Sequence, residues 1–202
     1  MEEGGKFSVK SSYKKLEELL ILEDKWNEDE KKAFGDIWKS KAPTKVVAFS
    51  WKLLLDRIPS KWNLKIRNVL PPENSTRSVL CGIEEETSKH CDKVTIVWEK
   101  VMRWVEIYFI TPPNLFVHWE CWKTGGRTKR IRQGLSIIWH ATIWGIWRVR
   151  NNIIFNNEEL DVEAMVEDIK VLSWRWVLNS LKIPTCLYYE WSWNPNDCLS
   201  RK

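Results

Sequence analysis

Three side chains near the middle of the chain have the chemistry of metal ligands. Cys81, His90 and Cys91 offer two thiols and an imidazole, the groups that zinc prefers in proteins. Position 78, where a Cys-x-x-Cys pair would begin, holds Ser, and its neutral hydroxyl binds zinc far more weakly than a thiolate. The spacing is that of a zinc knuckle with one ligand replaced, and zinc is the cofactor that it suggests. Two more distant candidates for a fourth ligand are Asp92 and Cys121.

Other reactive side chains are expected to be structural. His118 and His140 lie beside Trp residues on apolar faces, which is typical of core histidines. Cys186 and Cys198 lack the spacing of a ligand pair, and the sequence predicts free thiols there. The run Glu84–Glu86 is interpreted as a solvated acidic loop. The chain has no phosphate-binding loop and no Tyr-x-Asp-Asp carboxylate pair, so we expect no enzyme.

The net charge of +5 conceals two strongly basic blocks. Residues 38–77 and residues 123–150 are each rich in Lys and Arg, whereas residues 17–36 and 158–168 are acidic. If the two basic blocks meet in space, they could form one phosphate-binding surface. If they do not, the same lysines and arginines are ordinary solvated helix faces.

Composition indicates a folded protein of the cell interior. The 202 residues are 44% hydrophobic and include 15 Trp, which either fill a core or, where exposed, offer stacking faces to bases. Five Cys and no signal peptide favour a reducing, intracellular compartment and argue against a disulfide framework. The most apolar run, residues 135–147, is too short to span a bilayer, so no membrane segment is expected.

The elements that must position these side chains are mostly helices. Apolar residues at helical spacing predict helices over 47–58, 62–69, 92–108 and 131–150, the last apolar around most of its circumference and therefore central. Asp161 is expected to cap a further long helix. Residues 73–91 are predicted to be an irregular Cys/His loop. Residues 7–9 are predicted to be a short extended entry, and the tail at 188–193 is expected to dock as an extended segment. The predicted fold is a mainly α, multi-helix domain.

Several blocks resemble a known family. Gly-Lys-Phe-Ser-Val-Lys-Ser-Ser-Tyr at 5–13, Trp-Lys-Ser-Lys-Ala-Pro-Thr-Lys-Val at 38–46 and Leu-Leu-Asp-Arg-Ile-Pro at 54–59 are similar to blocks of one domain, as is Leu-Cys-Gly at 80–82. That domain is the zinc-binding domain downstream of the polymerase in the reverse transcriptases of plant non-LTR (LINE-type) retrotransposons. The resemblance covers about residues 4–105 and is looser beyond. It predicts a first domain over 4–110 and a helical, Trp-rich extension over 111–202, packed on the first.

The resemblance also implies a set of zinc ligands. The family pattern is Cys-x-x-Cys, then His, then Cys, and Cys81 matches the second Cys while Ser78 stands in the place of the first. His90 and Cys91 match either the His and the final Cys, or a non-ligand His before the final Cys. The chain is identified as a degenerate copy of the domain.

Two functions of different classes follow. The first is a non-catalytic accessory module that holds RNA or DNA near a reverse transcriptase polymerase domain. The alternative is a stand-alone protein–protein interaction or structural module, a retroelement remnant without nucleic-acid activity. Phosphate contacts in the first function are expected from Lys39, Lys41, Lys45, Lys52 and Arg57.

Overall fold

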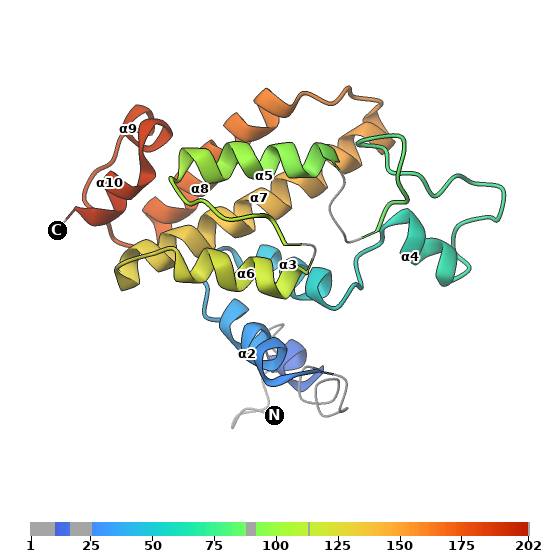
Figure 1. Ribbon diagram of the computed structural model, residues 1–202, viewed down its shortest axis with the longest axis horizontal. Coiled ribbons are helices and arrows are strands. Elements are labelled where there is room, and N and C mark those ends of the chain that lie inside the picture. The colour runs from blue at the N-terminus through green and yellow to red at the C-terminus, as the bar shows by residue number, and fades with distance from the viewer. Residues whose placement is uncertain (1–10, 17–25, 88–91, 113, 202) are drawn as a thin grey trace.

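The fold is a bundle of helices around one long helix (Figure 1). The computed structural model describes residues 11–16, 26–87, 92–112 and 114–201. Within these ranges the only β pairing is an isolated bridge between Arg77 and Glu85, which confirms the mainly α prediction. The extended entry predicted at residues 7–9 lies outside the described residues. The named helices are α2 (Glu28–Ile37), α3 (Thr44–Leu54), α4 (Lys61–Ile66), α5 (Asp92–Trp104), α6 (Leu115–Thr124), α7 (Lys129–Asn156), α8 (Val162–Ser180), α9 (Tyr188–Trp193) and α10 (Pro195–Ser200).

Helix α7 is the axis on which the other helices pack. It has 28 residues and so spans about 42 Å. It contacts α3, α5, α6, α8 and α10, and residues 134–143 are buried without interruption. A helix that is apolar around its circumference has to be enclosed by others, and this confirms the prediction of a central helix over 131–150. None of the helices in the described ranges combines the length and apolar character needed to cross a membrane.

Side-chain caps explain where several helices begin. Asn27 accepts a hydrogen bond from the backbone N–H of Glu30, whose own carboxylate accepts from the backbone N–H of Asn27, so α2 starts with a capping box. Asp161 accepts from the backbone N–H of Ala164 at the start of α8, as predicted from the sequence. Each cap satisfies a backbone donor that the first helical turn leaves without a partner.

The tail differs from its prediction. Residues 188–193 form helix α9 rather than an extended segment, and Pro195 opens a second short helix, α10. Asn194 accepts hydrogen bonds from the backbone N–H groups of Asn196 and Asp197, and proline at the first helical position already has the required φ. The apolar residues of the tail are too few to distinguish a period of two from one of 3.6. Helix α6 was likewise not predicted.

The two cysteines of the tail form a disulfide, which corrects the prediction of free thiols. Cys186 and Cys198 are both buried, and their Cα atoms are 5.9 Å apart. The α9–α10 turn brings together two residues that are 12 positions apart in sequence. A Cα separation in this range is the one that a disulfide needs, and sequence spacing alone does not reveal it.

Seven of the 15 Trp side chains are buried in the core, and five more pack against it while partly exposed. Those less than a tenth exposed are Trp51, Trp98, Trp104, Trp119, Trp122, Trp139 and Trp191. His118 lies among them, and the indole N–H of Trp139 donates to its Nδ1 at 3.0 Å. His118 and His140 are both fully buried, as expected of core histidines.

His140 connects the central helix to α3. Its Nδ1 lies 2.6 Å from the hydroxyl oxygen of Ser50, and that hydroxyl lies 2.9 Å from the carbonyl oxygen of Val46. Burial disfavours the charged imidazole and lowers the pKa of His140 from 6.5 to about 3. The ring is therefore neutral in the folded protein at neutral pH, whereas in the unfolded chain it takes up a proton below pH 6.5.

We predict that the folded state loses stability as the pH falls from 6.5 towards 3, because only the unfolded chain binds a proton at His140 in that window. The contribution of this group is about 1.4 kcal/mol per pH unit. Urea denaturation at a series of pH values measures it. His140→Gln should flatten the slope by that amount whatever its effect on stability at neutral pH. An unchanged slope in the variant would contradict the assignment.

Candidate functional site

The loop that carries Cys81 is closed by backbone hydrogen bonds. The backbone N–H of Ser78 donates to the carbonyl of Glu84 at 2.7 Å, and that of Glu86 donates to the carbonyl of Thr76 at 2.8 Å. Gly82 has φ +71°, a conformation that favours glycine, and its N–H donates to the carbonyl of Ser78. The turn that carries the first two predicted ligand positions, 78 and 81, is therefore formed within the described residues.

Ser78, at the predicted first ligand position, is buried. Its Oγ accepts a hydrogen bond from the backbone N–H of Leu80 at 3.2 Å, so the side chain supports the turn itself. Cys81, three residues on, is half-buried. Structural zinc is normally held by four ligands. Of the two predicted ligand positions that the structure describes, 78 and 81, only Cys81 offers a thiolate. This pair of residues therefore does not fit a structural zinc ion, for which the resemblance implies two cysteines here.

Within the described residues, no group of three potential metal ligands includes Cys81, Asp92 or Cys121. His90 and Cys91 lie outside the described residues, so their joining of Cys81 stays a prediction. Asp92 is exposed at the start of α5, and Cys121 is half-buried on α6.

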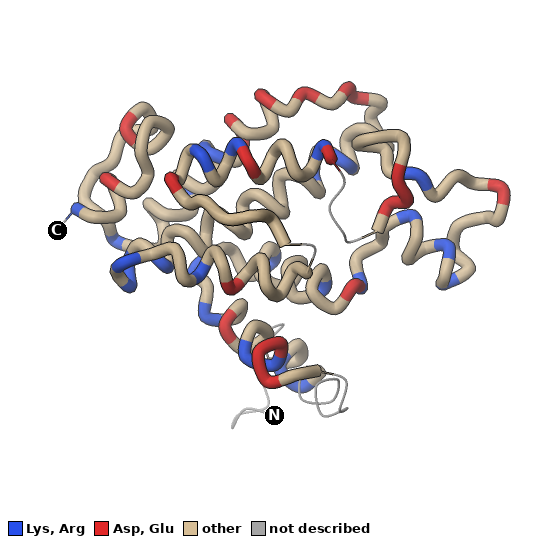
Figure 2. Tube along the Cα trace, in the orientation of Figure 1, with Lys and Arg blue, Asp and Glu red and all other residues tan. Residues whose placement is uncertain are grey.

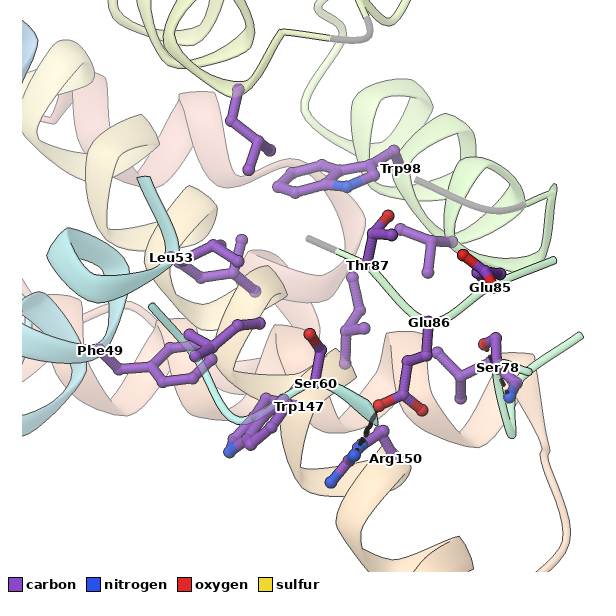
Figure 3. Close-up of a pocket in the computed structure, with 16 residues that line it drawn as sticks. Phe49, Leu53, Ser60, Ser78, Glu85, Glu86, Thr87, Trp98, Trp147 and Arg150 are labelled. Carbon is purple, nitrogen blue, oxygen red and sulfur yellow. Dashed lines mark hydrogen bonds and ion pairs between the residues drawn. The ribbon is translucent and has the colours of Figure 1, made fainter. Parts of the chain in front are cut away.

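Glu86 is not part of a solvated acidic loop, which corrects that interpretation. Its carboxylate forms an ion pair with Arg150 of α7, with Nη2 of the guanidinium 2.5 Å from Oε1 (Figure 3). Both side chains are less than a tenth exposed. The backbone N–H of Lys61 also donates to Oε1, and the face of Trp147 lies 4.7 Å from the guanidinium carbon. The other two members of the run are exposed.

A cavity of about 90 Å³ adjoins this ion pair. Its walls are mainly apolar and include Phe49, Trp98 and Trp147 (Figure 3). The second carboxylate oxygen of Glu86 has no hydrogen-bond partner within the described structure. The volume suits a few water molecules and is well below the roughly 300 Å³ of the smallest typical ligand pockets. We therefore do not regard the cavity as a substrate site.

The five predicted phosphate-binding residues are all exposed, but their surroundings differ. Lys39 pairs with Asp36 at 2.6 Å. Lys45 and Lys52 lie seven positions apart on α3 and therefore share a face. Lys45 lies over the ring of Trp144, and Lys52 lies over the ring of Tyr13, contacts that leave both charges at the surface.

A groove of about 640 Å³ brings two of these residues together with a third cation. Lys52 and Arg57 line it beside Arg67, which follows α4 and was not among the predicted residues. Arg67 is exposed, and the left-handed conformation of the next residue, Asn68, turns the chain there. The other lining residues are Tyr13, Leu16 and Trp51. Arg67 belongs to the first basic block, residues 38–77, but its position in the sequence gave no indication that it lines a groove with Lys52 and Arg57.

Two of the seven cations in the second basic block form ion pairs within the described part of the protein. Lys123 pairs with Glu120 at 2.9 Å and with Asp36, while Arg150 is buried with its acidic partner. Burial opposes ionisation of Asp36, but hydrogen bonds from Lys123 and Lys39 outweigh it and lower the pKa of this carboxyl group. Figure 2 shows basic residues both around α4 and at the start of α7, at opposite ends of the molecule. The two blocks meet at Asp36, with which Lys39 of the first block and Lys123 of the second both pair, but the cations around α4 lie apart from those at the start of α7.

One of three comparisons with known proteins found a match. Residues 7–100 match the model of the family described as zinc-binding in reverse transcriptase. This confirms the resemblance to reverse-transcriptase zinc-binding domains over that span and supports zinc as the cofactor class. Neither the curated proteins nor the solved structures gave a match.

We predict that Ser78→Cys gains zinc at this loop because it restores a thiolate at the first ligand position. The protein is purified under inert gas with the Cys186–Cys198 disulfide intact, and bound metal is measured by mass spectrometry. The wild type should carry well under one zinc per chain and the variant close to one. Ser75→Cys, which places a thiol at an exposed position three residues earlier, is the matched control. Stoichiometric zinc in the wild type would contradict the prediction, because it would show that the loop binds zinc without a thiolate at position 78.

Proposed function

We propose that this chain, whose residues 7–100 match the model of the family described as zinc-binding in reverse transcriptase, is a non-catalytic module that holds a single strand of RNA or DNA by its phosphates. The observation that carries the proposal is the groove in which Lys52, Arg57 and Arg67 lie beside Tyr13. A reverse transcriptase polymerase domain is the proposed protein partner, and the proposed location is intracellular.

The chemistry of the groove suits a flexible, charged backbone. Three exposed cations along one groove can each neutralise a phosphate and release a counterion. The ring of Tyr13, already in contact with the Lys52 ammonium, offers a face on which a base could stack. Such contacts position a strand without reading its sequence. We therefore propose sequence-tolerant binding.

Lys45 extends the same path along α3, and Lys41 lies just before the helix. Lys39 is the predicted residue least suited to the role. Its ammonium group already forms an ion pair with Asp36, and a phosphate would have to compete with that carboxylate. We propose Arg67 in its place.

A stand-alone interaction module remains the alternative, and one observation favours it. Trp193 is 86% exposed at the end of α9, with the exposed Tyr189 one turn earlier on the same helix and the exposed Leu187 at its N-cap. Exposed large apolar side chains grouped in this way are typical of protein contact sites.

We predict that binding of a fluorescent single-stranded RNA weakens steeply with salt. Each phosphate contact contributes about 0.7 to the slope of log affinity against log salt concentration for single strands. The triple variant Lys52→Gln, Arg57→Gln, Arg67→Gln should therefore lower the magnitude of the slope by about 2. Fluorescence anisotropy between low and physiological salt measures both proteins.

The matched control removes three exposed cations elsewhere, as Arg127→Gln, Lys129→Gln, Arg175→Gln. It changes the net charge equally and should leave the slope unchanged. Absence of binding at low salt, or an equal loss in the control, would overturn the proposal. Self-association that Trp193→Ala abolishes, without RNA binding, would favour the alternative.

A further inference from the structure

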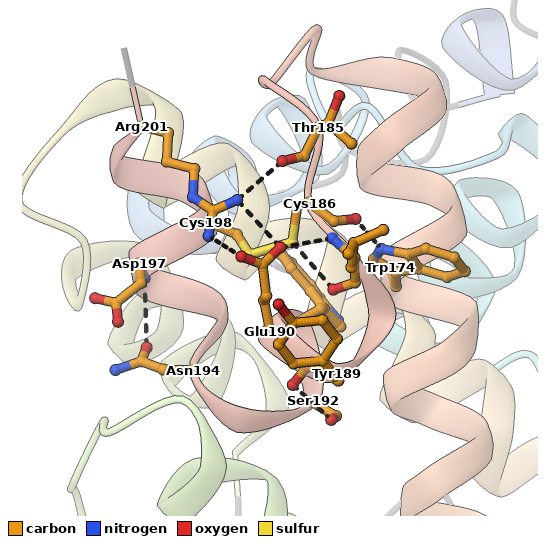
Figure 4. The surroundings of a disulfide bond; sticks show 12 residues. Trp174, Thr185, Cys186, Tyr189, Glu190, Ser192, Asn194, Asp197, Cys198 and Arg201 are labelled. Atoms are coloured by element: carbon orange, nitrogen blue, oxygen red, sulfur yellow. Dashed lines mark hydrogen bonds and ion pairs between the residues drawn. A yellow bond between two sulfur atoms is a disulfide. The ribbon is translucent and has the colours of Figure 1, made fainter.

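The disulfide lies beside a carboxylate that points towards it. Cys186, Glu190 and Cys198 place their potential ligand atoms within 4.8 Å of one another (Figure 4). Within the described residues this is the one group of three such side chains close enough to share a metal ion. The two sulfurs are buried, whereas the Glu190 side chain is 26% exposed and gives the group an opening to solvent.

The backbone and neighbouring side chains hold the group in place. Cys186 precedes α9 and Cys198 lies within α10, so the turn between the two short helices sets their separation. The indole N–H of Trp174 donates to the carbonyl of Cys186 at 2.9 Å. Glu190 accepts from the backbone N–H of Leu187 at 2.7 Å. This framework does not depend on the bond between the sulfurs.

We propose that, when the disulfide is reduced, Cys186, Cys198 and Glu190 bind one thiophilic divalent cation, with zinc the best match. The proposal is independent of nucleic-acid binding and of the loop at Cys81. Two thiolates and a carboxylate are ligands that zinc accepts in tetrahedral sites, and water can take the fourth position on the exposed side. The Cα separation of 5.9 Å lets both sulfurs reach one ion after small side-chain rotations.

The charges of the site balance. Two thiolates, one carboxylate and a divalent cation leave one net negative charge, and the Arg201 guanidinium lies 2.7 Å from Glu190 to offset it.

The exchange between the two states is balanced in atoms and electrons. Two molecules of a small thiol reduce the disulfide to two cysteine thiols and are themselves oxidised to one small-molecule disulfide. The cation then displaces one proton from each thiol. Both the disulfide and the metal-bound pair of thiolates connect Cys198 of α10 to Cys186 before α9. The tail would therefore stay cross-linked under oxidising and under reducing conditions.

The test uses the full chain, reduced with a phosphine that is then removed under inert gas, and titrated with Co²⁺ as a spectroscopic substitute for zinc. Binding should produce the intense thiolate-to-metal charge-transfer absorption, and zinc should abolish it by competition. The oxidised protein should give no such band from this site. Glu190→Gln, which keeps both thiols, should weaken Co²⁺ binding by more than about tenfold, a loss known even for residues that only support ligands.

Two variants identify which cysteines bind. Cys186→Ser together with Cys198→Ser should abolish the band, with circular dichroism confirming that the helices remain. Cys81→Ser, which alters the separate loop, should leave the band and its affinity unchanged. A reduced wild type without the band, or a band lost in Cys81→Ser but kept in the double variant, would overturn the proposal.

Discussion

The buried ion pair between Arg150 and Glu86 is the constraint on which the arrangement of this protein depends. It joins the end of the Cys81 loop to the central helix across 64 positions of sequence. Arg150 also donates to the carbonyl of Pro59, and the Glu86 carboxylate accepts from the backbone N–H of Lys61, the first residue of α4. One charged pair thus fixes three segments at one point. Removing two charges from water is costly, so the pair contributes to stability only while both partners are present.

This arrangement explains how the loop keeps its form with Ser at the first ligand position. In a metal-closed loop the ion supplies folding free energy. Here the Ser78 hydroxyl, the backbone ladder to Glu84 and the anchored Glu86 hold the same turn. Two residues of the groove beside Tyr13, Arg57 and Arg67, flank Lys61 in sequence, and the backbone N–H of Lys61 donates to the Glu86 carboxylate. The groove and the loop are therefore both connected to the Glu86 carboxylate.

Sequence patterns predicted the regular parts of this fold well. The period of the apolar residues identified α3, α5 and α7, and Asp161 marked the start of α8 through ordinary capping chemistry. Contacts between distant residues escaped prediction. Nothing local distinguishes Glu86 from its two acidic neighbours, or Arg150 from the other cations of its block, until the fold pairs them. The Cys186–Cys198 bond and the place of Arg67 in the groove depend in the same way on how the chain turns. The division at residue 110 stays a prediction.

The measurement that tests this account most directly is a double-mutant cycle on the pair, followed by urea unfolding. Arg150→Met and Glu86→Gln should each lower the free energy of unfolding by about 3–5 kcal/mol, because each leaves a buried charge without its partner. The double variant should lose clearly less than the sum. Lys31→Met, which breaks the exposed pair with Glu28, should cost about 1 kcal/mol or less. If the two buried variants cost no more than that control, or if their effects simply add, the pair is not the support that this fold depends on.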